Sequence, residues 1–187
     1  MDDVVLARHR ESETTAEGLV GGNAGLTKQG RAQARQLGER MAAIPIDVCL
    51  VSRAHRARET AEIALVGRHV PLQVLADLDD IGFGSFEGRP LAGYRAWVAE
   101  NPPSEAPPGG ESRVSTLRRF VRPSGRSRRG RSTARSCSPT ASSSAPPPTS
   151  GRSPQSPASP TGCIRLSADE LVRAAERLEM WCEAPSW

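Results

Sequence analysis

A histidine between two arginines follows the first apolar segment of the chain. The apolar segment covers residues 4–7, and Arg8, His9 and Arg10 come directly after it. Four apolar residues in succession are typical of a short buried strand, and an open α/β sheet binds ligands just beyond the carboxyl ends of its strands. A histidine there can attack a phosphoryl group while guanidinium groups hold the phosphoryl oxygens. The alternative is a polar loop after a core strand.

A second cluster of arginines lies at the start of a predicted helix. Residues 47–51 are another apolar segment typical of a strand, and a helix is predicted over 54–66; Arg53 lies between the two, and Arg56 and Arg58 lie at the start of the helix. The N-terminus of a helix attracts anions through its free N–H groups and its macrodipole. Both apolar segments therefore lead into groups that can bind phosphate.

Three carboxylates precede a glycine-rich loop. Asp77, Asp79 and Asp80 stand just before residues 81–88, where three glycines surround two phenylalanines. This composition predicts a tight loop with an aromatic anchor. Either one of the carboxylates donates a proton to a leaving group, or all three simply face water.

The elements that must position these groups alternate between strand and helix. A helix is predicted over 28–43, with Thr27 as its N-cap and one apolar face, and a third strand over 70–75. This order favours right-handed crossovers and a parallel sheet. Further helices are predicted over 91–101 and 111–121.

Five segments resemble, in order and spacing, the motifs of the histidine phosphatase superfamily, also called phosphoglycerate mutase-like. They are Arg-His-Arg-Glu-Ser at 8–12, Leu-Thr-x-x-Gly-x-x-Gln-Ala at 26–34, Ser-x-x-x-Arg-Ala-x-x-Thr-Ala at 52–61, Asp-Ile-x-x-Gly-x-Phe-Glu-Gly at 80–88 and Gly-Gly-Glu-Ser at 109–112. The expected fold is therefore α/β, a three-layer αβα sandwich with a mainly parallel sheet. The sheet is expected to be incomplete after about residue 121.

The resemblance implies roles for four of the residues above. His9 would be the nucleophile that becomes phosphohistidine, and Asp80 would donate a proton to the leaving oxygen. Arg8 and Arg56 would clamp the phosphoryl oxygens, which suits a planar guanidinium. Neither a cofactor nor a metal is expected, because positioning and charge stabilisation carry most of the catalysis of phosphoryl transfer.

The chain departs from the family pattern at several positions. Arg10 replaces a glycine and either adds a phosphate contact or crowds the pocket. Thr15 stands where an asparagine is expected. Arg10 and Thr15 are therefore both candidate phosphate-binding residues. Asp80 replaces a glutamate and is one methylene shorter. His55 is expected on a helix surface near the site, and His69 in a loop.

Residues 122–162 have a composition unlike the rest of the chain. They contain 12 Ser, 8 Pro and 7 Arg, no acidic residue and none of Val, Ile, Leu, Met, Phe, Tyr or Trp. Such a segment cannot bury enough apolar surface to offset chain entropy, which predicts a disordered linker. The net charge of +4 arises here, because the other residues include 18 basic and 21 acidic ones. Nucleic-acid binding is not expected, because no aromatic side chain is present to stack on a base.

A third hypothesis for this segment is a shifted reading frame. The resemblance implies a second essential histidine, in a strand followed by His-Gly, but no histidine follows His69. With one choice of codons that end in G or C, residues 135–144 give Val-Val-Leu-Ala-His-Gly-Val-Val from the third base of the first codon. A frameshift near 121–123, by sequencing error or gene decay, would explain this. Codons across 138–141 that cannot encode His-Gly in the shifted frame would contradict it.

Three parts of the chain are therefore expected. Residues 1–121 form an α/β domain of the histidine phosphatase type, 122–162 a disordered segment, and 163–187 a C-terminal helix. Residues 167–170 predict a capping box at the start of this helix, and an apolar stripe predicts that it packs on the domain.

The predicted function is hydrolysis of a small phosphorylated metabolite through phosphohistidine at His9, with the chain inactive if the second histidine is essential. One alternative is a phosphotransferase of the phosphoglycerate mutase type, which the short loops disfavour. Another is a catalytically dead chain with a basic, polyanion-binding tail. The expected partner is a small phosphate ester, and the oligomeric state stays open.

No segment indicates export or membrane insertion. Acidic residues at positions 2 and 3 predict no signal peptide, and no apolar run is long enough to cross a membrane. The four cysteines are far apart, without a CxxC pair, which indicates neither zinc nor a disulfide framework. The expected location is therefore the cytoplasm.

Overall fold

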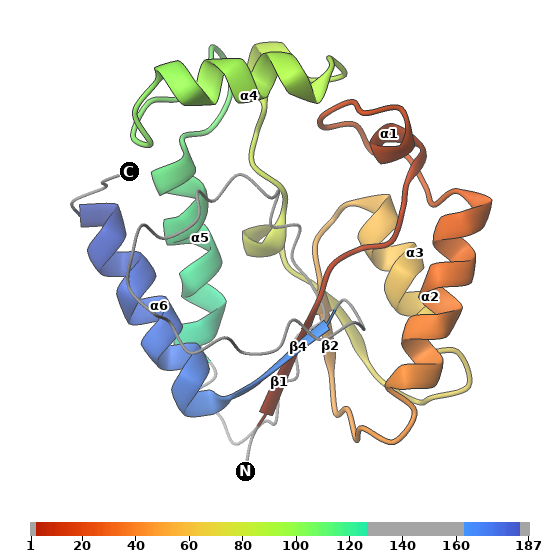
Figure 1. Ribbon diagram of the computed structural model, residues 1–187. Helices are drawn as coiled ribbons and strands as arrows, with labels where there is room; N and C mark the ends of the chain where they lie inside the picture. The colour runs from red at the N-terminus through yellow and green to blue at the C-terminus, as the bar shows by residue number, and fades with distance from the viewer. Residues whose placement is uncertain (1–2, 127–162, 184–187) are drawn as a thin grey trace, which may run out of the picture.

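The strands of the protein lie between two pairs of helices in the computed structural model, which describes residues 3–126 and 163–183 (Figure 1). In chain order the elements are β1 Asp3–Ala7, α1 Glu13–Ala16, α2 Lys28–Arg40, β2 Cys49–Val51, α3 His55–Ala64, β3 Leu72–Val74, the 3₁₀ turns η1 Ala76–Leu78 and η2 Gly84–Phe86, α4 Leu91–Glu100, α5 Arg113–Arg126, β4 Cys163–Ser167 and α6 Ala168–Glu183. Helices α2 and α3 cover one side of the strands, and α5 and α6 the other. The predicted three-layer α/β architecture is confirmed.

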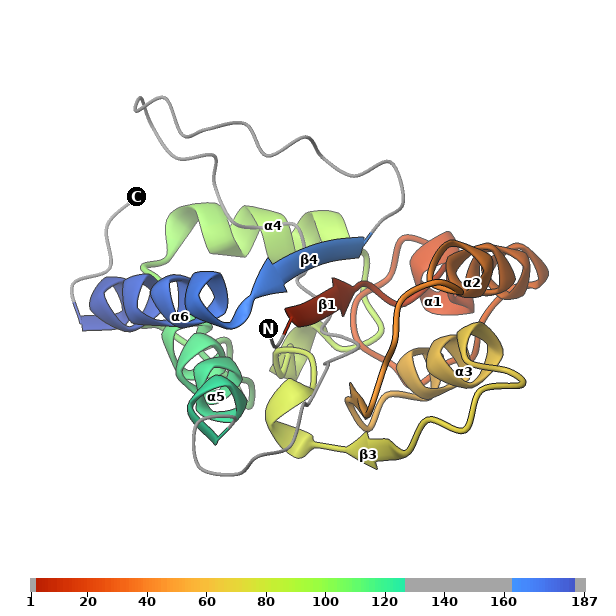
Figure 2. The same cartoon turned by 90° about the horizontal axis from the view of Figure 1, so that it is seen from below.

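The strands pair in two two-stranded sheets. β2 and β3 are parallel, with Cys49 opposite Leu72, as the order of strand, helix and strand predicts. β1 pairs with β4, and this pair is antiparallel, with Val5 opposite Arg165 (Figure 2). The prediction of a mainly parallel sheet therefore holds for β2 and β3 only. The reason is that β1 needs a partner for its backbone groups, and β4 supplies it from the C-terminal part of the chain.

The C-terminal helix is shorter than predicted, because residues 163–167 form β4 instead. The predicted capping box is confirmed: the Glu170 N–H donates to the Ser167 hydroxyl at 3.3 Å, and the Ser167 N–H donates to the Glu170 carboxylate at 2.8 Å. Helix α6 then lies beside α5 (Figure 1).

Helix α5 ends at Arg126 and so continues into the segment 122–162, which was expected to be disordered throughout. The rest of that segment lies outside the described residues, and with it the linker, polyanion-binding and frameshift hypotheses. In the described ranges, no helix is both long and apolar enough to span a membrane.

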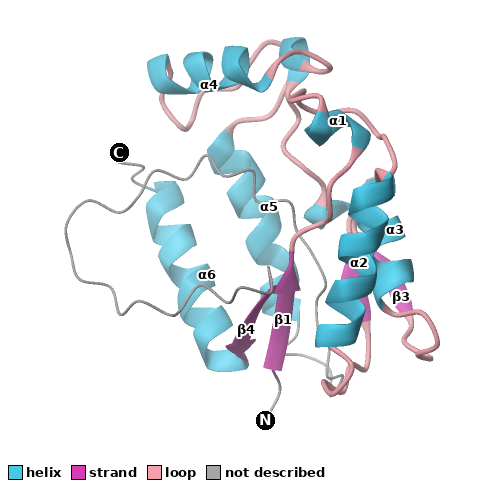
Figure 3. Cartoon of the chain, turned by 45° about the vertical axis from the view of Figure 1, so that its right-hand side comes forward, coloured by secondary structure: helices cyan, strands magenta, loops and turns pink. Residues whose placement is uncertain are grey.

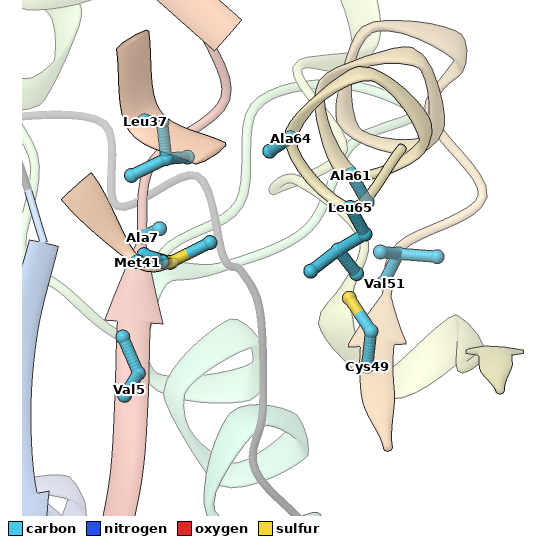
Figure 4. Close-up of a cluster of buried hydrophobic side chains, with 9 residues drawn as sticks. All are labelled: Val5, Ala7, Leu37, Met41, Cys49, Val51, Ala61, Ala64 and Leu65. Carbon is cyan, nitrogen blue, oxygen red and sulfur yellow. The ribbon is translucent and has the colours of Figure 1, made fainter. Parts of the chain in front are cut away.

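The main core joins β1 and β2 to the helices α2 and α3. Figure 4 shows its nine buried side chains, which are Val5, Ala7, Leu37, Met41, Cys49, Val51, Ala61, Ala64 and Leu65. Leu37 and Met41 belong to the apolar face predicted for the helix over 28–43, and both are buried. This core fixes the two strand ends from which the arginine clusters emerge.

A smaller aromatic core holds the glycine-rich loop under α4. The rings of Phe83 and Tyr94 meet edge to face, with centroids 4.8 Å apart, and Val20 and Trp97 complete the cluster. Helices α1 and α4 lie beyond the carboxyl end of β1 (Figure 3). The predicted aromatic anchor is therefore confirmed, and it lies at the end of the strand that leads to His9.

A pair of glycine substitutions tests how tightly α2 packs on the loop after His9. A Cβ atom on Gly30 would lie 1.9 Å from the Glu11 carbonyl oxygen, whereas on Gly93 it would meet nothing closer than 4.0 Å. We expect Gly30→Ala to lower the free energy of unfolding by about 3 kcal/mol, and Gly93→Ala, in the matched helical control, to raise it by about 1 kcal/mol. Urea unfolding measures both, and equal effects would contradict the close packing.

Candidate active site

His9 has a defined orientation directly after β1. Its Nδ1 lies 2.7 Å from the carbonyl oxygen of Arg10. A carbonyl oxygen can only accept, so this contact assigns the ring proton to Nδ1. The lone pair of Nε2 is then available to attack an electrophile.

The environment of His9 keeps its ring neutral. The pKa of His9 is lowered from the ordinary 6.5 to about 4, mainly by burial and also by the charges of Arg56, Arg8 and Arg10, while the hydrogen bond to the Arg10 carbonyl acts in the opposite direction. An unprotonated ring at neutral pH is what a nucleophile requires.

The titration of His9 is a direct test of this environment. NMR of the ring protons is expected to give a midpoint near 4 for His9. The unfolded chain takes up this proton near 6.5, so the free energy of unfolding is expected to fall as the pH is lowered from 6.5 towards 4. A His9 midpoint near 6.5 would contradict the burial that the structure gives it.

Two helices hold the loop that carries His9. The N–H of Arg10 donates to the Thr60 hydroxyl at 3.1 Å, and that hydroxyl donates to the Arg56 carbonyl at 2.7 Å, which ties the loop to α3. The hydroxyl of Thr27 donates to the Glu11 carboxylate at 2.7 Å and caps α2. The motifs at 26–34 and 52–61 thus provide positioning contacts around His9.

Arg56 and Asp80 form an ion pair at the N-terminus of α3. The Arg56 side chain is only 5% exposed, and its Nη1 also donates to the Gly22 carbonyl at 2.9 Å. Burial raises the pKa of Asp80, against the opposing charges of Arg56 and Arg8, and the charge of Asp79 raises it further. The predicted proton donor thus contacts Arg56 directly.

A loop from the N-terminal part of the chain completes the start of α3. Ala54, the residue at the N-cap position, makes no side-chain cap. Instead, the Asn23 side-chain oxygen accepts the His55 N–H at 2.7 Å. With the contact between Gly22 and Arg56, this loop is fastened twice to the helix that presents Arg56.

The structure brings His9, Arg56 and Asp80 together, because Thr60 ties the backbone after His9 to Arg56, and Arg56 pairs with Asp80. The charges of Arg8 and Arg56 act on the pKa values of both His9 and Asp80, and the charge of Arg10 acts on that of His9. The Thr15 hydroxyl has a structural role instead. It accepts the Ser12 N–H and donates to the Ser12 carbonyl, which completes the capping box of α1. A phosphate contact from Thr15 or from the Arg10 side chain stays a prediction.

The other candidates lie around this group. Asp79 pairs with Arg53 at 2.6 Å, and His55 and His69 are exposed, as predicted. In residues 3–126 and 163–183, no group of three or more His, Cys, Asp and Glu could hold a metal ion.

Sequence reasoning missed three residues that organise the site. These are Asn23, which caps α3, and the ion pair of Glu111 with Arg119, which bonds the backbone carbonyl of Asp80. Glu111 lies in the recognised motif at 109–112 but received no role, and no motif drew attention to Asn23 or Arg119.

Comparison with known proteins gives the chain a family. The family model of the histidine phosphatase superfamily (branch 1) matches residues 4–133. The adenosylcobalamin/alpha-ribazole phosphatase of Salmonella typhimurium is 35% identical over 127 residues, which are 63% of this chain and 62% of that protein. The 2,3-bisphosphoglycerate-dependent phosphoglycerate mutase 2 of Gloeobacter violaceus is 30% identical over 131 residues, 64% of this chain and 60% of that one.

The folds also agree. The alpha-ribazole phosphatase of Shigella flexneri superposes with a TM-score of 0.60 and 25% identity, over 72% of this chain and 71% of that chain. The chain spans about three fifths of the length of the Salmonella typhimurium and Gloeobacter violaceus proteins. The family match and the fold agree with the motifs, and this chain belongs to the histidine phosphatase superfamily, branch 1.

Proposed function

We propose that this protein hydrolyses phosphate monoesters through a phosphohistidine at His9. The observation that carries the proposal is that Arg56 pairs with Asp80 while Thr60 ties the backbone after His9 to the Arg56 carbonyl. The charges of Arg8 and Arg56 also lower the pKa values of both His9 and Asp80, and these two guanidinium groups would hold a phosphate group next to the nucleophile and the carboxyl group.

The reaction then takes two balanced steps. The lone pair of His9 Nε2 attacks phosphorus, the P–O bond to the leaving group breaks, and the Asp80 carboxyl gives its proton to the leaving oxygen. Water next attacks the phosphohistidine, the Asp80 carboxylate takes the proton of that water, and the electron pair of the P–N bond returns to Nε2. The raised pKa of Asp80 favours the protonated carboxyl that the first step needs.

The relatives support a phosphatase and suggest a substrate. Adenosylcobalamin/alpha-ribazole phosphatase and 2-carboxy-D-arabinitol-1-phosphatase are among the names of the curated relatives. Alpha-ribazole phosphate is therefore the first natural ester to test, within the class of small phosphorylated metabolites. A cytoplasmic location is part of this proposal, supported by the free thiol of Cys49.

Release of phosphate from p-nitrophenyl phosphate by the full chain, with a metal chelator present, tests the proposal. The rate is expected to be low, because the resemblance implies a second histidine and none follows His69. If neither this chain nor a version with the His-Gly strand restored releases phosphate above the protein-free rate, the proposed function is wrong.

A further inference from the structure

The guanidinium group of Arg119 on α5 converges on the loop that leads to Asp80. Its Nη1 donates to the carbonyl oxygens of Asp77 and Asp79, at 3.0 and 2.8 Å, and more weakly to that of Ala76 at 3.4 Å. Its Nη2 donates to the Asp80 carbonyl oxygen at 3.2 Å. One side chain therefore gathers four carbonyl groups of the short segment that ends at Asp80.

Glu111 fixes Arg119 from the other side. The two side chains pair at 2.7 Å, and both are largely buried, at 17% and 23% exposure. Burial opposes ionisation of Glu111, but the hydrogen bond and charge of Arg119 dominate and lower its pKa. The Glu111 N–H also donates to the Gly82 carbonyl at 2.8 Å. The loop is thus bonded just before Asp80 and again just after it.

The backbones on this side approach too closely for larger residues. A Cβ atom on Gly110 would lie 2.6 Å from the Gly82 carbonyl oxygen, and one on Gly84 would lie 2.3 Å from the Pro108 carbonyl oxygen. Gly84 also has a positive φ of 55°. The glycines of the two motifs at 80–88 and 109–112 therefore allow the contact that Glu111 and Arg119 secure.

We propose that Arg119 is a positioning residue for the proton donor: by clamping the carbonyl groups up to Asp80, it holds the Asp80 carboxyl in reach of the leaving oxygen. The inference rests on the proposed function. A planar fork with five donors can satisfy several carbonyl groups at once, whereas a lysine ammonium is a single point charge. General acid catalysis requires the Asp80 carboxyl to lie within hydrogen-bond distance of the leaving oxygen. A loosened loop therefore weakens proton donation before it affects the other steps.

The test uses two esters and two variants of the full chain. Arg119→Lys keeps the charge but loses the fork, and Arg118→Lys is the matched control at an exposed position of the same helix. The esters are p-nitrophenyl phosphate, whose leaving group departs without a proton, and glycerol phosphate, whose alkoxide needs one. Hydrogen exchange of the amides at 77–81 reports on the loop without any need for turnover.

We expect Arg119→Lys to lower kcat for glycerol phosphate at least about tenfold more than for p-nitrophenyl phosphate. It should also speed the exchange of the loop amides, while Arg118→Lys changes neither. In an Asp80→Asn background the difference between the esters should no longer respond to Arg119→Lys, because the two residues act as one unit.

Equal loss of rate on both esters would show a general structural role and overturn the inference, as would unchanged exchange of the loop amides. If no version of the chain hydrolyses either ester, the proposed function fails, and the exchange rates alone then decide whether Arg119 holds the loop.

Discussion

A His9→Ala variant is expected to lose the hydrolysis of p-nitrophenyl phosphate, with kcat lowered at least about a thousandfold. The Nδ1 proton of His9 is bonded to the Arg10 carbonyl, and burial keeps the ring neutral, so Nε2 carries the attacking lone pair. The other two histidines, His55 at the start of α3 and His69 in the loop after it, are both exposed. Steady-state kinetics measure kcat. The comparison uses the chain as given or the version with the restored reading frame, whichever hydrolyses the ester.

His69→Ala is the control for this prediction, since it removes an exposed histidine from a loop away from the site. It should leave kcat unchanged. Rapid acid-free quenching during turnover should also trap an acid-labile phosphohistidine in the wild-type chain and none in His9→Ala. Full activity of the His9→Ala variant would rule out a mechanism through phosphohistidine at His9.

Restoring the alternative reading frame after about residue 121 is expected to raise kcat by about a hundredfold or more. The restored peptide would contain His-Gly after a strand-like apolar segment, where the family resemblance implies a second phosphate-binding histidine. Its imidazole would add a donor to the oxygens that Arg8 and Arg56 are proposed to hold. The comparison uses the full chain as given and the full restored chain, with p-nitrophenyl phosphate and without added metal.

A restored chain in which that new histidine is replaced by alanine separates the imidazole from the improved fold. Its free energy of unfolding should equal that of the restored chain, and its kcat should equal that of the chain as given. If the chain as given is already as active as the restored chain and still depends on His9, the second histidine is dispensable here, and the frameshift hypothesis loses its functional argument.

The sequence predicted the parts of the site that depend on local order. The apolar segments before Arg8 and Arg53 become β1 and β2 because strands need only a short apolar run inside a core. Thr27 caps α2 as predicted, since an N-cap bonds within its own first turn. The motifs by themselves identify His9 and Asp80 as candidates.

The partners of these residues came from contacts that no local pattern contains. Asn23 caps α3 across 32 positions of sequence, and Arg119 reaches the Asp80 carbonyl across 39. The pairing of β1 with β4 joins the two ends of the described chain. Such contacts depend on which surfaces the packed core brings together, so neither propensity nor spacing predicts them.

The sequence by itself determined the family motifs, the nucleophile and acid candidates, and the alternation of strands and helices, because these follow from residue type and short-range periodicity. Only the tertiary structure decided the protonation of His9, the pairing of Asp80 with Arg56 and the clamp formed by Arg119. A pKa or a long-range hydrogen bond depends on burial and on groups that are distant in sequence. Burial and the positions of those groups are fixed only when the helices pack around the strands.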